Sequence, residues 1–173
     1  MKKLWVILFV ALLLCGCGKD KALETVSDVH AEQVVARMQE IRVNIPPELS
    51  TPAMQSVDGG KLYLSDKYSV WVQTLPAGDL AQTVRTVTGQ DKEKMQIQTT
   101  RQGSAKRHQF TWVTTGEQGA RVGRTCILDD GTYHYVLTAL AEETAAEGLQ
   151  TTWKEMFASF CVAPEKEPVS TGS

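Results

Sequence analysis

Cys17 is the residue whose chemistry the sequence indicates most directly, because a small residue, Gly16, precedes it at the end of an apolar run. Lys2-Lys3 gives the chain a positive start, and the run Leu4 to Leu14 is about 11 residues long, as in a signal-peptide core. The segment ending at Cys17 is typical of a bacterial lipoprotein signal. Residues 1–16 are therefore predicted to be a signal peptide, and Cys17 the lipidation site.

The alternatives for this segment are an ordinary secretory signal and an uncleaved anchor. A helix needs about 20 apolar residues to cross a bilayer, and this run is much shorter. Cleavage before Cys15 would leave bulky Leu14 at the cleavage point. Each buried methylene contributes about 0.8 kcal/mol and two acyl chains anchor stably. We therefore expect the mature chain to bind the cell membrane through Cys17, on its extracytoplasmic face.

A second candidate site combines His134 with Asp129 and Asp130, whose carboxylates could act as bases or as cation ligands. The competing interpretation is structural, because Asp is common in hairpin turns. His30 and His108 have no second His or Cys at metal-ligand spacing. The sequence therefore predicts no catalytic, cofactor or metal site, and leaves an enzyme near His134 and Asp129 as the alternative.

Other chemical motifs are missing from the sequence. It contains no GxSxG, SxxK or HExxH pattern, and no glycine-rich loop opens a helix to hold phosphate. Once the signal is cleaved and Cys17 is acylated, Cys126 and Cys161 remain. An extracytoplasmic location permits a disulfide between them, and their apolar surroundings equally suit two buried free thiols.

Composition predicts one domain after the signal. The formal charge of -2 includes Lys2 and Lys3, so the mature chain carries about -4, and its cations are scattered. That pattern argues against a nucleic-acid partner. Residues 17–26 are predicted to be the lipidated end and tether, 27–163 a single α+β domain, and 164–173 a disordered tail.

The first half of the domain is predicted to contain a helix, a strand and a hairpin. A helix beginning at Ser27 or Asp28 would bury Val34, Val35, Met38 and Ile41, while alternation favours a strand over 41–45; we expect helix first and strand after. Residues 46–55 read as a loop. Residues 61–65 and 68–75 then form a hairpin, and a short helix follows from Asp79 to Gly89.

The second half is predicted to be a four-stranded antiparallel meander closed by a helix. The strands are 95–101, 108–115, 120–128 and 132–140, and Asp130-Gly131 indicates a type I′ turn. Thr144 and Glu147 form a capping-box pattern before the last helix. One face of that helix is apolar and should pack on the sheet; it carries Leu149, Trp153, Met156, Phe157 and Phe160.

Aromatic residues offer one more hypothesis. Trp71, Trp112, Tyr63 and Tyr68 could line a ligand groove or a partner surface. Strand alternation instead favours a place in the core for most of them.

The segments 123–124, 127–131 and 133–137, followed by a last helix ending Met156 to Phe160, resemble the PsbP-like (DcrB/PsbP-type) bacterial lipoproteins. The resemblance covers about residues 60–162. It implies a central antiparallel sheet flanked by helices, an α-β-α sandwich, in proteins that serve mainly as accessory or binding subunits, some of them in photosynthetic complexes. No shared catalytic residues come with that fold. We therefore expect a non-catalytic envelope module, without a cofactor, that binds a protein partner or a small ligand.

Overall fold

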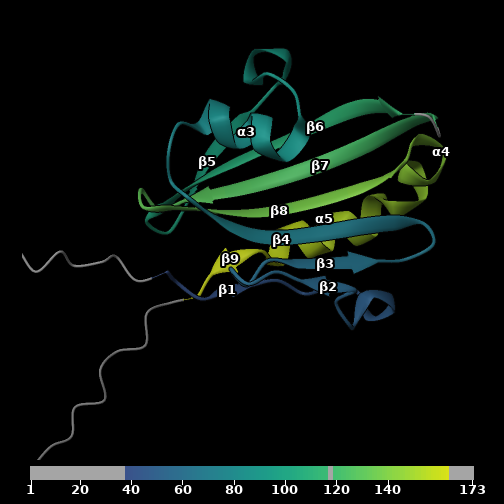
Figure 1. The fold of residues 1–173 in the computed structure, drawn as a ribbon, viewed down its shortest axis with the longest axis horizontal. Helices are drawn as coiled ribbons and strands as arrows, with labels where there is room; N and C mark the ends of the chain where they lie inside the picture. The colour runs from purple at the N-terminus through teal and green to yellow at the C-terminus, as the bar shows by residue number, and fades with distance from the viewer. Residues whose placement is uncertain (1–37, 117–118, 164–173) are drawn as a thin grey trace, which may run out of the picture. The chain divides into compact units, whose positions relative to one another are not determined.

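An antiparallel sheet of seven strands, in the order β2-β3-β4-β8-β7-β6-β5, organises the chain (Figure 1). The structure is a computed structural model that describes residues 38–116 and 119–163; the signal peptide, tether and tail predictions lie outside these residues. The strands are β2 Met54–Gln55, β3 Lys61–Leu64, β4 Tyr68–Pro76, β5 Gln98–Gln102, β6 Ala105–Gly116, β7 Gly119–Asp129 and β8 Tyr133–Glu142.

The predicted meander and hairpin are both confirmed, and they join into this one sheet. Strands β5 to β8 are consecutive neighbours, while β4 pairs with β8 from Tyr68 opposite Ala141 to Pro76 opposite Tyr133. Strand β5 begins later than predicted because a 3-10 helix, η2 Lys92–Lys94, precedes it. Met95, expected in that strand, instead packs its side chain against the core beside helix α3 Leu80–Thr88.

Helix α3 covers part of one face of the sheet and has the ends that the sequence predicts. The Asp79 carboxylate accepts a hydrogen bond from the Ala81 amide, and Gly89 ends the helix in the left-handed conformation at φ 71°. Between α3 and the sheet lies a cluster of buried apolar side chains: Val84, Phe110, Trp112, Ile127 and Val136.

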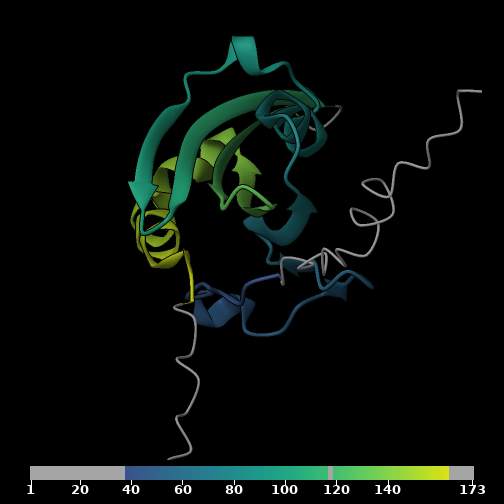
Figure 2. The same cartoon turned by 90° about the vertical axis from the view of Figure 1, so that its left-hand side faces the viewer.

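The opposite face is covered by α4 Glu143–Ala146, the 3-10 helix η3 Glu147–Leu149 and α5 Gln150–Ser159. Figure 2 shows these helices within the concave side of the curved sheet. The predicted apolar stripe is buried, with Trp153 1% exposed and Phe157 and Phe160 fully enclosed. The prediction of a capping box at Thr144 and Glu147 was wrong. Strand β8 runs directly into α4, so Thr144 lies within the first turn of the helix. The N-cap residue is Glu142, whose side chain makes no capping hydrogen bond.

A second, two-stranded sheet pairs β1 Ile41–Arg42 with β9 Cys161–Val162. The predicted strand over 41–45 is therefore two residues long, although its alternation was correct: Ile41, Val43 and Ile45 pack against the α5 side of the core. Residues 38–40 have no regular structure, and the rest of the helix expected before them lies outside the described residues. The loop 46–55 includes the 3-10 helix η1 Pro47–Leu49 before β2.

No helix among the residues that the structure describes is both long and apolar enough to span a membrane.

Replacement of Trp153 by Ala should destabilise the fold by about 3–5 kcal/mol, because the indole leaves a cavity that the sheet and α5 cannot close. Trp71→Ala provides the control, since Trp71 is 43% exposed. Its free energy of unfolding should stay within about 0.5 kcal/mol of the natural chain. Denaturant unfolding measures both, and equal midpoints for the two variants would contradict the burial of Trp153.

Candidate functional site

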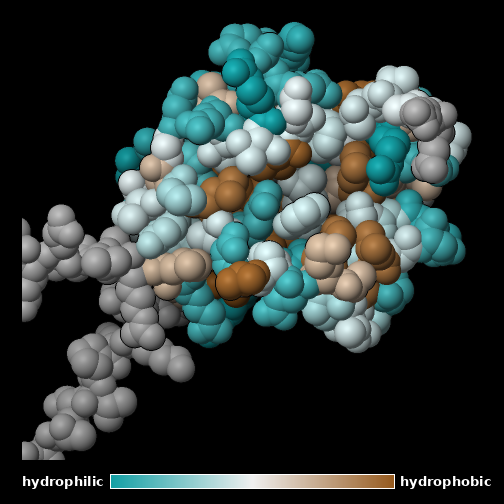
Figure 3. Space-filling view, viewed as in Figure 1, coloured by the Kyte–Doolittle hydropathy of each residue, from teal (hydrophilic) through white to brown (hydrophobic). Residues whose placement is uncertain are grey.

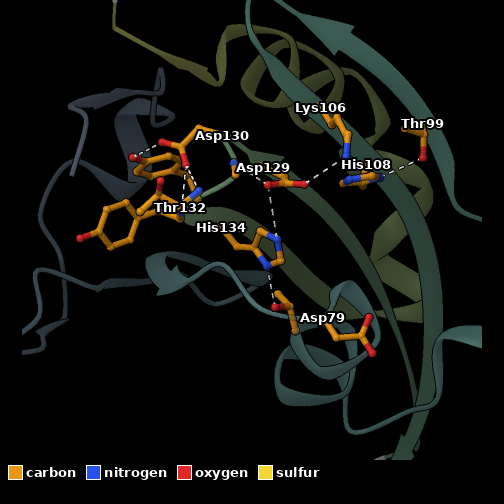
Figure 4. Close-up of polar contacts among 12 residues, drawn as sticks. Asp79, Thr99, Lys106, His108, Asp129, Asp130, Thr132 and His134 are labelled. Atoms are coloured by element: carbon orange, nitrogen blue, oxygen red, sulfur yellow. Dashed lines mark hydrogen bonds and ion pairs between the residues drawn. The ribbon is translucent and has the colours of Figure 1, made fainter. Parts of the chain in front are cut away.

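A hydroxyl, an imidazole and a carboxylate lie in a row between α3 and the sheet (Figure 4). Thr83 Oγ1 is 2.7 Å from His134 Nδ1, and His134 Nε2 is 3.7 Å from Asp129 Oδ1. The first distance is that of a hydrogen bond, whereas the second is too long for one. His134 is 2% exposed, Thr83 5%, and the Asp129 side chain 17%.

The register of the sheet and the orientation of α3 create this row. Asp129 ends β7 and pairs directly with His134 near the start of β8, so both side chains leave the sheet on the α3 side. Thr83 comes from the inward face of α3, next to buried Val84.

Burial keeps the His134 ring neutral near physiological pH. Loss of solvent lowers the pKa of His134, and the negative charges of Asp129 and Asp130 offset only part of that effect. A neutral ring with its proton on Nε2 accepts the Thr83 hydroxyl at Nδ1 and directs its N–H toward Asp129. The Thr83 bond therefore satisfies a ring nitrogen that would otherwise be buried without a partner.

A second imidazole lies two strands away from His134, on the other side of β7. His108, on β6, is 6% exposed, and its Nδ1 is 2.9 Å from Thr99 Oγ1 on β5. Burial lowers the pKa of His108, partly opposed by Asp129 and reinforced by His134. Lys106 Nζ lies 4.0 Å from Asp129 Oδ2, so this carboxylate sits between a lysine and the neighbouring imidazoles.

Asp130, the other predicted carboxylate, belongs to a different set of contacts. Its Oδ1 accepts the amides of Thr132 and Tyr133, and its Oδ2 accepts the Tyr135 hydroxyl at 2.9 Å. Burial alone would raise the pKa of Asp130, but these hydrogen bonds lower it below its ordinary value.

The prediction of a type I′ turn at Asp130-Gly131 was wrong. In the described residues only glycines have positive φ, so Asp130 does not adopt the left-handed conformation that such a turn requires of both central residues. Its carboxylate instead shapes the connection through the Thr132 and Tyr133 amides.

A hydroxyl, an imidazole and a carboxylate in this order make up a nucleophilic catalytic triad, but the geometry of these three groups argues against nucleophilic catalysis. A triad hydroxyl must reach a substrate carbonyl, whereas Thr83 is closed in by the sheet, and the His134 to Asp129 distance exceeds a hydrogen bond. Two surface hollows lie within the described residues, and neither is lined by Thr83, His134 or Asp129. Within 38–116 and 119–163, no three His, Cys, Asp or Glu side chains are grouped to hold a metal ion.

Sequence reasoning named His134 and Asp129 but missed Thr83. The structure brings the first two together because their strands pair, a relation that no sequence spacing reports. A signal for Thr83 did exist, since it lies between Leu80 and Val87 on the apolar face of α3, where a hydroxyl needs a polar partner.

Both remaining thiols are free, so the disulfide considered between Cys126 and Cys161 is not formed in the structure. Cys126 is fully buried in β7, and burial raises its pKa to about 11, although Arg107 and Arg124 act in the opposite direction. A thiol with that pKa is protonated at neutral pH and unsuited to nucleophilic catalysis.

The aromatic residues divide between core and surface. Tyr63, Tyr68 and Trp112 are buried, as the core interpretation predicts, and Trp71 is 43% exposed. Leu64 is also exposed on the neighbouring strand β3, and so is Met54 on β2, which pairs with the far edge of β3. In the face drawn in Figure 3, apolar side chains form small groups separated by polar ones.

No family model matches the chain, and no curated protein matches it. Solved structures do share its fold. A Bacteroides thetaiotaomicron protein has a TM-score of 0.51 and 9% identity over 73% of this chain, which spans only 46% of that protein. The likeness therefore concerns the α+β fold, which the structure shows directly.

Two further structures are similar at lower scores. LpqN of Mycobacterium tuberculosis, described as involved in cell envelope biogenesis, has a TM-score of 0.49 and 12% identity, covering 75% of this chain and 88% of its own. The Ran-binding protein Mog1p of Saccharomyces cerevisiae has a TM-score of 0.46 and 17% identity, covering 70% and 89%. Membership of the PsbP-like family stays a prediction.

Acidification should destabilise the protein through its buried imidazoles. The folded-state pKa values of His134 and His108 lie below the ordinary 6.5, so unfolding takes up protons in this range. The stability that the neutral rings contribute is complete above pH 6.5 and falls as the pH drops through the lowered values.

The melting temperature should therefore decrease between about pH 7.5 and about pH 5, and less steeply in the variant His134→Gln. The comparison concerns the slope, so a general destabilisation of the variant does not affect it. Parallel slopes for the two proteins would contradict the burial of a neutral ring at this position.

Proposed function

We propose that the chain is a lipid-anchored, non-catalytic module of the cell envelope that binds a protein partner or a small ligand on the extracytoplasmic face of the membrane. The observation that supports a binding role most strongly is the enclosure of the Thr83–His134–Asp129 row beneath α3. The imidazole and the hydroxyl of this row are both buried, which argues against their use on a substrate.

The alternative is an envelope enzyme that uses His134 and Asp129. It would require α3 to move away from the sheet, which would also expose the apolar side chains around Val84, Phe110 and Ile127. Exposing such side chains costs about 1.5–3 kcal/mol each. The neutral imidazole and its hydroxyl partner are better explained as a satisfied polar pair in the core.

The membrane location rests on the sequence around Cys17, which has the charged start, apolar run and small residue of a lipoprotein signal. Two acyl chains on this residue would hold the domain at the membrane without a spanning helix.

Substitution of Cys17 by Ser should abolish lipid attachment, because the hydroxyl replaces the thiol that follows the predicted cleavage point. Metabolic labelling with radioactive palmitate, followed by purification of the full chain, measures the result. Cys15→Ser is the matched control, since it removes a neighbouring thiol from the same segment and should keep the label.

Label on the Cys17→Ser protein, or none on the natural chain, would contradict the lipid anchor. Loss of label in both variants would show that the signal, rather than Cys17 itself, had been damaged.

A further inference from the structure

A groove of about 400 Å³ lies on the α5 side of the sheet and is lined by cationic and amide side chains. It is bounded by α5 and by the outer strands β5 to β7. No carboxylate contributes to its lining, which consists of Arg101, Gln102, Arg107, Gln109, Arg124, Lys154 and Ala158. The local charge is therefore opposite in sign to that of the chain as a whole.

Arg124 carries a half-buried charge that has no ion-pair partner among the described residues. It is half-buried on β7, and its guanidinium lies 4.8 Å from the centre of the Phe157 ring. Burial lowers the pKa of Arg124, and the nearby charge of Arg107 lowers it further. A buried charge of this kind is stabilised when an anion approaches it.

Arg107 is held in a fixed position beside it. Its Nη1 donates to Gln102 Oε1 at 2.7 Å and to the Phe160 carbonyl at 2.8 Å, and its Nη2 donates to the Phe157 carbonyl. These bonds use three of the five donors of a guanidinium. Arg107 thus caps the C-terminal end of α5. It is also a cation held in a fixed position, with two N–H donors not used in these bonds.

Capping of α5 explains Arg107 alone. It does not explain why Arg124 comes from the next strand to the same place, or why Lys154 of α5 lines the same groove. The ion pairs of the described residues lie elsewhere: Arg85 and Lys94 with Asp91, and Lys106 with Asp129. With Arg101 of β5, four cations from four elements thus line a groove in which no carboxylate neutralises them.

We propose that this groove binds a phosphate-bearing anion between Arg124 and Arg107, with Lys154 beside it. Guanidinium groups match phosphate oxygens with paired hydrogen bonds, and a lysine adds charge without fixed geometry. Amide donors at Gln102 and Gln109 can serve the remaining oxygens. The phosphate belongs either to a phospholipid headgroup or to a soluble phosphorylated molecule. The inference rests on the proposed binding role, and does not depend on the lipid at Cys17.

Binding is measured with the full lipidated chain in neutral detergent micelles, by titration calorimetry at constant ionic strength. Inorganic pyrophosphate is the soluble probe. Micelles containing phosphatidylglycerol, compared with micelles containing phosphatidylcholine, present the headgroup. We expect saturable binding of at least one probe, pyrophosphate or phosphatidylglycerol.

Two variants test the groove. Arg124→Gln and Lys154→Gln each remove one cation and should weaken binding by about tenfold or more, as for the loss of a charge-assisted hydrogen bond. Arg121→Gln is the matched control: it makes the same charge change on β7, at a residue outside the groove lining, and should leave affinity unchanged. Thermal unfolding confirms that each variant is folded, and exposed Lys154 provides the variant with the least risk to the fold.

Pyrophosphate binding that the groove variants weaken would support a soluble phosphate ligand. Binding of phosphatidylglycerol alone, with the same variant pattern, would support a lipid headgroup. Absence of saturable binding to either probe, or an equal loss in Arg121→Gln, would overturn the proposal. A chain that lacks palmitate but binds these probes would contradict the anchor and leave the groove intact.

Discussion

Packing of α5 against the sheet is the constraint on which the rest of the structure depends. The helix places Trp153, Met156 and Phe157 on the inner strands, where they are almost fully enclosed. Complete burial of such side chains contributes roughly 1.5–3 kcal/mol each. The same packing fixes the end of the chain, since the residues after α5 form β9 and pair with β1. The sheet curves around this helix (Figure 2).

The two faces of the sheet consequently differ in whether their polar side chains are buried or accessible. On one face α3 closes over His134, so an imidazole, a hydroxyl and a carboxylate are used for internal satisfaction of polar groups. On the other face α5 leaves a space between itself and the outer strands β5 to β7, and this space is the basic groove. Groups with catalytic potential are enclosed, and groups with binding potential are accessible. This division supports the binding role that we propose for the domain.

Local patterns in the sequence predict much of this fold, and long-range pairings explain where prediction fails. The α3 cap at Asp79 and the stripe through Trp153 depend on residues a few positions apart, and both are confirmed. The basic groove was not predicted because Arg107, Arg124 and Lys154 are scattered along the chain and meet only through strand pairing and helix packing. Thr83 has a local signal, its place on the apolar face of α3, but its partner His134 lies 51 residues further along the chain. The prediction of a type I′ turn was wrong because Asp130 does not adopt the positive φ that this turn needs. Its carboxylate shapes the connection instead, by accepting a hydrogen bond from the Thr132 amide.

Accessibility of His134 tests most directly the claim that the His134 row is structural. Diethyl pyrocarbonate modifies exposed neutral imidazoles, and mass spectrometry of the digested full chain locates each modified histidine. We predict that His134 stays unmodified in the native protein and reacts fully in the same chain after denaturation, because the ring is 2% exposed when folded. Modification of His134 in the native protein at the rate of the denatured chain would contradict it. That result would mean that α3 opens readily and that the row is available for catalysis.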